Sequence, residues 1–403
     1  MPSRPVLLVL NQYYAPGYES TAHLLTELCE ALVETFDVTV VTGTVDGAPK
    51  PERTVRNGVR VVRVGSTAFD RSRLALRGFN YLSFFALALA AGLRHRKPDL
   101  ILCLSDPPFV SAVGVAVARR HDAPLLVVTQ DIFPEIAVAL GRLDNRLLVA
   151  TLDRLVRFGL SNADGVVAIG QNMRRRLGEK GVRDEAITVI PNWTDTDTLA
   201  ARPRDNPWAH EHGLVDRFVV MHSGNVGYAQ DLETVIYAAT FLRDLDDLQF
   251  VIVGSGALGG VLAELAKRLE VTSVRFLPYQ ARERLPESLS SADVHVVGLA
   301  AGLAGYVVPS RLYGILAVGR PVIVHADADS ETAEIVRDNG CGLVVPPGRP
   351  ELLARAIRDA YDGRLDLEQM AAASRTYAVQ EANRDVAIDR YRTLISAFAG
   401  AGR

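Results

Sequence analysis

Short runs of apolar, mostly β-branched residues alternate with longer stretches at helical spacing along nearly the whole chain. Several runs, such as LLVV at 125–128, are apolar without alternation, as expected for strands covered on both faces. Regular strand–helix alternation favours a parallel, doubly wound α/β sheet. Strands are predicted at 6–10, 38–41, 59–64, 100–104, 125–129, 165–169 and 187–190, and then at 218–221, 249–253, 274–277, 294–297, 321–324 and 342–345.

The pattern is interrupted once, near the middle of the chain. Pro191–Asn192–Trp193 leads into a polar stretch containing Pro203 and Pro207, after which strand–helix alternation restarts. A length of 403 residues exceeds one ordinary core. We therefore predict two Rossmann-like domains, at 1–197 and 198–375, followed by a helical segment at 376–403.

Composition narrows the possible partners and compartment. The formal net charge of −3 provides no global attraction to nucleic acid, so we expect no nucleic-acid partner. The three cysteines lack Cys-x-x-Cys spacing, which argues against disulfides or a zinc site and favours the cytoplasm. The apolar run at 6–10 is too short for a signal peptide and is predicted as a strand.

The nearly all-apolar segment 81–93 has two interpretations. At about 13 residues it is shorter than the roughly 20 that span a bilayer, so it is expected either to be a core helix or to rest on a membrane surface. Basic residues flank it on both sides, which makes the region 71–97 a candidate for peripheral contact with an anionic membrane.

Glycine-bearing turns follow predicted strands in both halves of the chain. They include Gly224 and Gly227 after 218–221, Gly254 after 249–253, and Gly17–Tyr18 after the first strand. Strand-to-helix turns can leave N–H groups free at a positive helix end, which suits phosphate. The cleft between the two domains is thus the expected place for a diphosphate ligand.

Gly254-Ser-Gly256-Ala-Leu-Gly259 matches the literal G-x-G-x-x-G pattern of dinucleotide sites. The acidic residue expected at the end of the next strand is missing, because Pro278 and Tyr279 occupy that place. Close strand–helix packing explains the glycines equally well. We therefore expect no resident cofactor, and the scattered Asp-x-Asp spacings predict no metal site.

The run from Val307 to Ile323 carries more specific chemistry. Ser310 is expected to cap a helix that begins at Arg311, leaving N–H donors and a cation beside any bound phosphate. The alternative is an ordinary capped helix with a solvated arginine.

At this point the chain resembles the GT-B glycosyltransferases, specifically the retaining enzymes of family 4 related to N-acetylfucosaminyltransferase in surface-polysaccharide assembly. The resemblance covers essentially the whole chain in the correct order. It is carried by NQYYAPGYESTAHLLTEL (11–28), VVTQDIFPEIAVALG (127–141), ADGVVAIGQNMRRRL (163–177), ITVIPNWTD (187–195), MHSGNVGYAQDLETVI (221–236), PSRLYGILAVGRPVI (309–323) and EIVRDNGCGLVVPPG (334–348).

The resemblance implies that the second domain binds a nucleotide sugar and the first binds the acceptor. It also implies that the C-terminal helix returns to the first domain. Asp131 is implied at the reacting centre, with Glu135 a weaker candidate, and Arg311 over the phosphates. Donor contacts are implied for Gly224, Asn225, Gly227, Gly254, Pro278, Tyr279, Pro309 and Ser310, and approach from the other domain for Gly17 and Tyr18.

The chain departs from the family pattern at its acids and cations. Tyr306 and Gly314 occupy the positions of the usual Glu pair, so Glu331 or Glu334 is the candidate substitute. Asn225 and Gln230 replace the common Arg and Lys of the diphosphate turn. Arg311 is therefore expected to be the main cation of the site.

The resulting expectation is a metal-independent, retaining hexosyltransferase, peripheral on the inner face of the cell membrane. It would move a sugar, in particular an N-acetylated hexose, from a UDP donor to a polysaccharide, lipid-linked or small-molecule acceptor. Two alternatives remain open: a non-hydrolysing UDP-sugar epimerase, which shares the fold, and a catalytically silent partner subunit.

Overall fold

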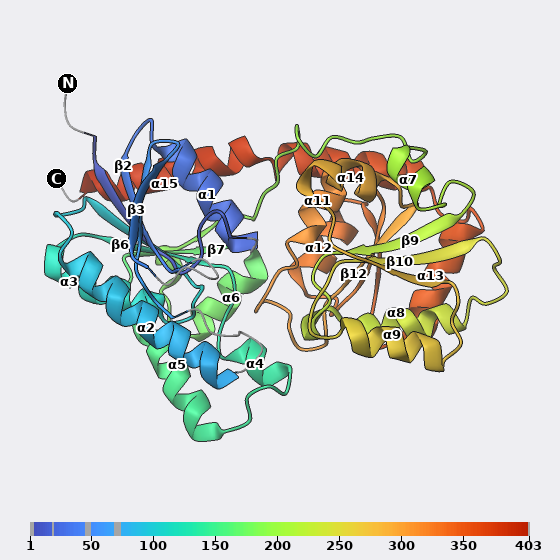
Figure 1. The fold of residues 1–403 in the computed structure, drawn as a ribbon, viewed down its shortest axis with the longest axis horizontal. Coiled ribbons are helices and arrows are strands. Elements are labelled where there is room, and N and C mark those ends of the chain that lie inside the picture. Colours follow the sequence, from blue (N-terminus) through green and yellow to red (C-terminus); the bar gives the residue numbers. More distant parts are fainter. Residues whose placement is uncertain (1–3, 18–19, 45–49, 68–73, 402–403) are drawn as a thin grey trace. The chain divides into compact units, whose positions relative to one another are not determined.

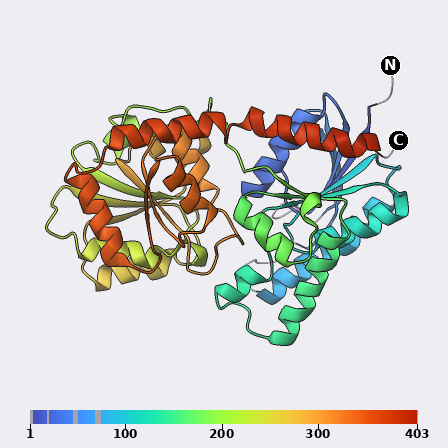
Figure 2. The same ribbon diagram turned by 180° about the vertical axis from the view of Figure 1, so that it is seen from behind.

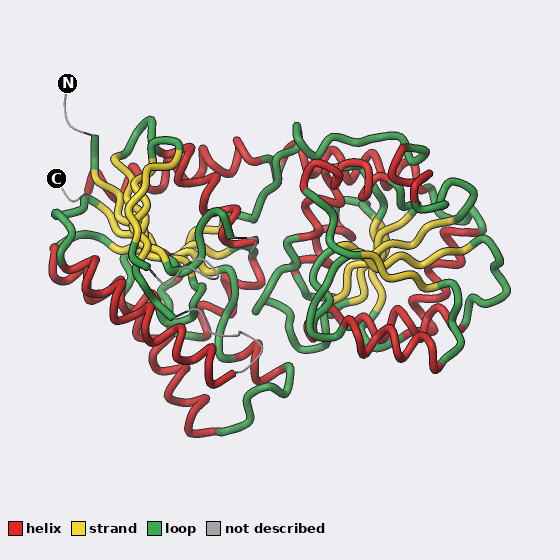
Figure 3. Tube along the Cα trace, viewed as in Figure 1, coloured by secondary structure: helices red, strands yellow, loops and turns green. Residues whose placement is uncertain are grey.

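The computed structural model describes residues 4–17, 20–44, 50–67 and 74–401. The chain divides into two compact units, one made of residues 1–138, 143–191 and 388–403, and the other of residues 139–142 and 192–387. Each unit contains one sheet with helices on both faces, as Figures 1 and 3 show. The predicted pair of Rossmann-like α/β units is confirmed.

The first unit is built on an eight-stranded sheet with the order β3-β4-β2-β1-β5-β6-β7-β8. The central strands β1, β5 and β6 are buried along their whole length, which explains their unbroken apolar sequences. Its strands are β1 (Val6–Leu10), β2 (Asp37–Thr42), β3 (Glu52–Arg56), β4 (Val59–Arg63), β5 (Leu100–Leu104), β6 (Leu125–Thr129), β7 (Gly165–Ala168) and β8 (Ile187–Val189). Its helices are α1 (Ser20–Leu32), α2 (Leu74–Leu93), α3 (Val110–His121), α4 (Glu135–Ala139), α5 (Arg146–Ser161) and α6 (Gln171–Glu179).

The sequence pattern did not predict β3, the antiparallel edge strand of this sheet. All five of its residues are exposed, so it has no apolar face to reveal it. It forms a hairpin with β4 through Asn57 and Gly58, at φ values of 45° and 85°. Asn-Gly is the favoured pair for a tight hairpin turn, and that dipeptide was the available signal.

The second unit is built on a six-stranded, all-parallel sheet with the order β11-β10-β9-β12-β13-β14. Its strands are β9 (Phe218–Ser223), β10 (Leu248–Val253), β11 (Val274–Leu277), β12 (Val294–Gly298), β13 (Val322–His325) and β14 (Gly342–Val345). Its helices are α7 (Pro207–Glu211), α8 (Leu232–Thr240), α9 (Gly259–Arg268), α10 (Leu285–Ser290), α11 (Arg311–Ala317), α12 (Glu331–Asp338), α13 (Pro350–Tyr361) and α14 (Leu367–Gln380).

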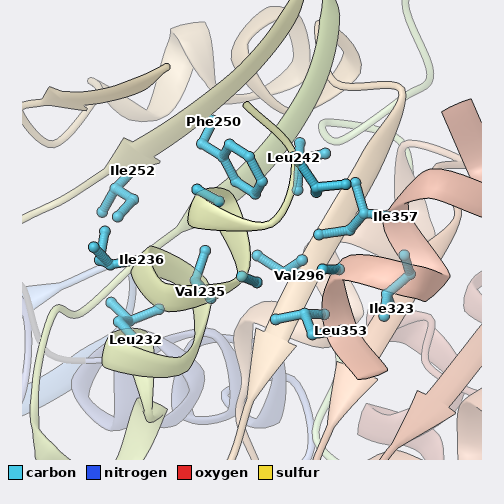
Figure 4. Close-up of a cluster of buried hydrophobic side chains, with 14 of the residues drawn as sticks. Leu232, Val235, Ile236, Leu242, Phe250, Ile252, Val296, Ile323, Leu353 and Ile357 are labelled. Atoms are coloured by element: carbon cyan, nitrogen blue, oxygen red, sulfur yellow. The ribbon is translucent and has the colours of Figure 1, made fainter. Parts of the chain in front are cut away.

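A dense apolar core fixes this sheet against α8 and α13. Figure 4 shows Leu232 and Val235 of α8, Phe250 of β10, and Leu353 and Ile357 of α13 among the packed side chains. All five are at most 1% exposed. Burying a side chain of this size contributes roughly 1.5–3 kcal/mol to the free energy of unfolding. The carboxyl edge of the sheet is therefore supported by a stable core.

The C-terminal segment differs in detail from the prediction. The chain leaves the first unit after Pro191 and rejoins it at Ile388, within α15 (Arg384–Ala401), whereas boundaries at 197/198 and 375/376 were predicted. Thr194 explains the shift, since its N–H donates to the Ala382 carbonyl at 2.9 Å and its carbonyl accepts from the Arg384 N–H at 3.0 Å. These bonds tie the start of the connection to the segment between α14 and α15.

The end of α15 packs within the first unit, as the view from behind in Figure 2 shows. A β-carbon added at Gly165 would lie 2.6 Å from the Phe398 ring, so that glycine leaves space for the aromatic side chain. Tyr391 and Ile395 of the same helix are at most 1% exposed. The helix is therefore part of the first unit's core.

Helix α2 begins earlier than predicted and has two faces. Phe84 and Ala88 are fully buried, while Leu82 is 66% exposed and Leu87 39% exposed. The core and the surface interpretations of this segment each describe one face. Among the described residues, no helix combines the length and apolarity needed to cross a membrane.

The glycine turns after β9 and β10 lie against each other. Gly254 has φ +141°, and an added β-carbon there would lie 1.9 Å from the Gly224 carbonyl oxygen. A β-carbon at Gly256 would lie 2.3 Å from the Val226 carbonyl oxygen. Gly254 and Gly256 are thus required for backbone packing between neighbouring turns.

Gly254→Ala should therefore destabilise the protein by about 2–4 kcal/mol, because the two turns would have to separate. Gly259→Ala is the matched control, since an added β-carbon at Gly259 meets nothing within 4 Å. It should change stability by less than about 1 kcal/mol. Thermal unfolding followed by circular dichroism measures both, and equal losses for the two variants would contradict the packing role.

Candidate functional site

The carboxyl ends of the six parallel strands in the second unit lie at one edge of its sheet. Ligands of open α/β sheets bind at such edges. The donor-side candidates at this edge that follow β9, β10 and β11 are Gly224, Asn225, Gly227, Gly254, Pro278 and Tyr279. Tyr279 is 55% exposed, and Asn225 and Pro278 are also exposed.

Arg311, the first residue of α11, supplies positive charge to this edge. A β-carbon added at Gly224 would lie 3.2 Å from the guanidinium carbon of Arg311, so the side chain lies over the β9 turn. Its Nη2 donates to the Asn225 carbonyl at 3.4 Å. Burial lowers the pKa of Arg311 to about 10, which leaves it charged at neutral pH. Within the described part of the chain, no carboxylate forms an ion pair with it.

The expectation of free turn amides is wrong for three of the glycines. The Gly224 N–H donates to the Val253 carbonyl and the Gly254 N–H to the Leu277 carbonyl, each at 2.9 Å. The Gly227 N–H donates to Oε1 of Gln230 at 3.0 Å. The N–H groups of these three glycines are therefore not free for a ligand, because the neighbouring turn or Gln230 already accepts from them.

The predicted capping of α11 by Ser310 is also wrong. Ser310 occupies the N-cap position, but its side chain makes no capping hydrogen bond, because its backbone is already helical at φ −60° and ψ −24°. Pro309 before it is buried, and its carbonyl accepts from the Leu312 N–H at 3.1 Å. The positive charge at this helix start thus comes from Arg311 itself.

The acidic candidates of the second unit, Glu331 and Glu334, lie on α12. Glu331 and Glu334 occupy its first turn, and Ser330 caps the helix by accepting from the Ala333 N–H at 3.3 Å. The charge of Glu331 contributes, after burial and Tyr377, to raising the pKa of Tyr313 on α11. The carboxylate therefore lies near α11.

The positions of the family's usual Glu pair have different surroundings. A β-carbon at Gly314 would contact Leu199 at 3.6 Å and Leu289 at 3.8 Å, so this side of α11 faces apolar side chains. Tyr306 is half-buried, and its N–H donates to the Leu303 carbonyl at 3.0 Å.

Three polar residues at this edge were not among the sequence candidates. His222 and His325 end the apolar runs of β9 and β13 and are at most 1% exposed. Asp231 lies before α8, where its carboxylate accepts from the Gly348 N–H at 3.0 Å and lies 3.5 Å from Nδ1 of His325. Polar side chains at the last positions of buried strands were the signal that could have identified the histidines.

The first unit places Asp131 directly after β6. The Asp131 N–H donates to Oγ of Ser105 at 3.2 Å, and the residue lines a small pocket with Phe133 and Leu160. Loss of hydration beside these apolar walls, and then the charge of Asp106, raise the pKa of Asp131 to about 7. The residue is nevertheless exposed to solvent, so a proton can be exchanged at this carboxyl group.

Glu135, the weaker acidic candidate, is engaged by a buried lysine. Nζ of Lys180, whose side chain is 3% exposed, lies 2.6 Å from both Glu135 and Asp153. This arrangement joins α4, α5 and the end of α6. The Gly17 N–H donates to the Tyr14 carbonyl at 3.1 Å, and Tyr18 lies outside the described residues.

Comparison with known proteins identifies both halves of the chain. Residues 21–193 match the family described as "Glycosyl transferase 4-like domain", and residues 207–377 match "Glycosyl transferases group 1". The chain is 31% identical over 301 residues to a putative colanic acid biosynthesis glycosyl transferase, WcaI, of Escherichia coli K12, covering 71% of each chain. It is 25% identical over 329 residues to a probable glycosyltransferase, WbjE, of Pseudomonas aeruginosa, covering 81% of this chain and 82% of that protein.

Solved structures agree on the fold. Anabaena HepE in complex with UDP superimposes with a TM-score of 0.75 at 18% identity, covering 97% of this chain and all of HepE. Sucrose-phosphate synthase from Thermosynechococcus elongatus gives 0.79 at 19% identity, covering 98% of this chain and all of that one. The chain therefore belongs to the family 4 glycosyltransferases of the GT-B fold.

Proposed function

We propose that this glycosyltransferase is a retaining, metal-independent enzyme. It transfers a sugar, an N-acetylated hexose, from a UDP donor to a polysaccharide, lipid-linked or small-molecule acceptor. The donor binds at the carboxyl edge of the second unit's sheet, and the acceptor binds to the first unit.

The guanidinium of Arg311, which forms no ion pair with a carboxylate of the described residues, is the observation that carries this proposal. A half-buried cation without a carboxylate partner among the described residues is suited to an anion of matching geometry. It lies over the turn that follows β9, close to the exposed ring of Tyr279, whose pKa it lowers against the larger effect of burial. A nucleoside diphosphate offers both an anion and a flat base for these two side chains.

The relatives support the same ligand class. HepE has been crystallised with UDP, with UDP and glucose, and with UDP-glucose. The name of WcaI refers to colanic acid biosynthesis.

Charge stabilisation is the proposed chemical contribution of Arg311. Departure of UDP places negative charge on the leaving phosphate oxygen, and a preorganised cation lowers the barrier to that step. The departing phosphate can take up the proton of the acceptor hydroxyl, so this retaining mechanism requires no covalent enzyme intermediate.

Arg311→Ala should weaken UDP binding by roughly 1.5–3 kcal/mol, the usual range for a lost charge-assisted hydrogen bond. Isothermal titration calorimetry with UDP measures the change. Arg268→Ala on α9, an exposed arginine of the same unit, is the matched control and should bind UDP as the wild type does. Unchanged affinity in a folded Arg311→Ala protein would remove Arg311 from the donor site.

The same samples test the reaction itself. With a UDP-N-acetylhexose and no acceptor, the wild type should release UDP slowly by hydrolysis, and NMR should detect a free sugar of retained anomeric configuration. Formation of the C2 epimer would instead identify an epimerase. Absence of both UDP binding and turnover would identify a silent partner subunit.

Asp131 is proposed to orient the acceptor hydroxyl by a hydrogen bond, while the departing phosphate takes up the proton of that hydroxyl. Asp131→Asn should lower transfer to the acceptor by about 100-fold or more while UDP affinity stays the same. An equal loss of UDP affinity would contradict a role confined to the acceptor side.

Asp131 also has a predicted effect on stability. Because its folded pKa of about 7 lies above the unfolded value of roughly 4, the wild type should lose stability as the pH rises between these values. The melting temperature of Asp131→Asn minus that of the wild type should therefore be larger at pH 8 than at pH 4. A pH-independent difference would contradict the raised pKa.

Peripheral membrane contact is proposed for the exposed faces of α2 and α5. On α2, Phe79 is 59% and Leu82 66% exposed; on α5, Leu147 is 81% exposed. Both helices pack against α3, and Arg94 and Arg146 lie exposed on them or beside their ends. Apolar side chains flanked by arginine suit an anionic bilayer surface.

Phe79→Ser combined with Leu82→Ser should therefore release the protein from phosphatidylglycerol liposomes in a cosedimentation assay. The matched control is Phe241→Ser combined with Val261→Ser in the second unit, at side chains that are 55% and 54% exposed. It removes similar exposed apolar area and should leave binding unchanged. A wild type that never cosediments would contradict membrane contact.

A further inference from the structure

A buried imidazole lies directly beneath the Arg311 guanidinium. His222 is the penultimate residue of β9 and is 1% exposed. Nη1 of Arg311 lies 2.5 Å from Nε2 of His222 and 3.2 Å from its Nδ1. The other terminal nitrogen of Arg311, Nη2, donates to the Asn225 carbonyl at 3.4 Å. The guanidinium is therefore held at two nitrogens, one over the strand end and one over the turn.

The imidazole is suited to accept a hydrogen bond. Burial and the adjacent charge of Arg311 hold the pKa of His222 well below its usual range. The other ionisable groups that affect it are the buried His325 and His295, which act in the same direction. Nε2 of His222 also lies 3.3 Å from the Asn225 carbonyl, which can only accept, so the position of the ring proton decides which bonds form. With the proton on Nδ1, Nε2 accepts from Nη1 of Arg311; with the proton on Nε2, Nε2 donates to Asn225 and Nδ1 accepts from Nη1. In either neutral form one ring nitrogen accepts from Arg311, whereas a protonated imidazole has no acceptor.

Because the hydrogen-bond acceptor is a neutral imidazole, the positive charge of Arg311 is retained. A carboxylate at this position would also orient the guanidinium, but it would neutralise the positive charge that attracts an anion. A neutral imidazole orients the side chain and leaves its charge in place. The remaining N–H groups of the guanidinium stay available for a ligand.

Glycine at position 224 completes this arrangement. Its added β-carbon would approach the guanidinium carbon to 3.2 Å, and its φ of +137° is rarely adopted by residues with side chains. The guanidinium can therefore lie close to the backbone of the turn. The end of β9 and the turn that follows it thus both contact the side chain of Arg311, the first residue of α11.

We propose that His222 is a positioning residue, which holds Arg311 over the β9 turn so that its unneutralised charge faces the diphosphate of the donor. This inference rests on the proposed donor site and adds a residue to it. His222 acts through Arg311, so its effect on affinity should disappear when Arg311 is absent.

A double-mutant cycle tests this dependence, with UDP as the probe in isothermal titration calorimetry. His222→Leu removes the acceptor and should weaken UDP binding about tenfold. His222→Gln keeps a neutral acceptor and should bind within about threefold of the wild type. In an Arg311→Ala background, His222→Leu should cause no further loss.

The outcomes separate this inference from the proposed function. Suppose that the wild type binds UDP and that Arg311→Ala weakens binding. If His222→Leu then weakens UDP binding as much in the Arg311→Ala background as in the wild type, His222 acts independently of Arg311 and the inference is wrong. Equal losses for the Leu and Gln variants would also contradict it. A wild type that binds no UDP contradicts the proposed donor site itself. Melting temperatures of all variants identify any loss that comes from unfolding.

Discussion

A positive charge held without a negative partner is the feature on which this account of the second unit depends. Arg311 lies against the backbone of Gly224 and against a neutral histidine, and no carboxylate neutralises it among the described residues. Holding a guanidinium partly out of water costs free energy, as its lowered pKa shows. An arginine kept in this state is prepared to bind an anion, because the anion restores the interaction that burial removes.

The parallel sheet explains why such a site forms at this edge. All strands of the second sheet run in the same direction, so their carboxyl ends and the turns that follow them lie together. Close approach of the β9 and β10 turns requires glycine. Several backbone N–H groups of these turns already donate to carbonyls of the protein. A diphosphate bound at this edge would therefore depend on side chains that reach over the turns, and Arg311 is the one proposed here.

Much of the fold could be predicted from the sequence, because buried parallel strands are continuous apolar runs. The exposed strand β3 could not be predicted in that way, since its pairing depends on the Asn57–Gly58 turn and not on burial. The choice of Arg311 as the main cation followed from the absence of other basic residues in the turns. Free turn amides and capping by Ser310 were incorrect, because both depend on backbone geometry between neighbouring elements. His222 could have been noted as a polar residue near the end of a buried strand, but its relation to Arg311 depends on a distance that the sequence does not give.

A crystal structure of the protein with UDP bound would show whether Arg311 holds the diphosphate. Diphosphate oxygens should lie within hydrogen-bonding distance of the Arg311 guanidinium, above the turn at Gly224, while Nη1 of Arg311 stays on His222. A diphosphate bound at another edge of the fold, or an Arg311 side chain turned away from it, would contradict the account.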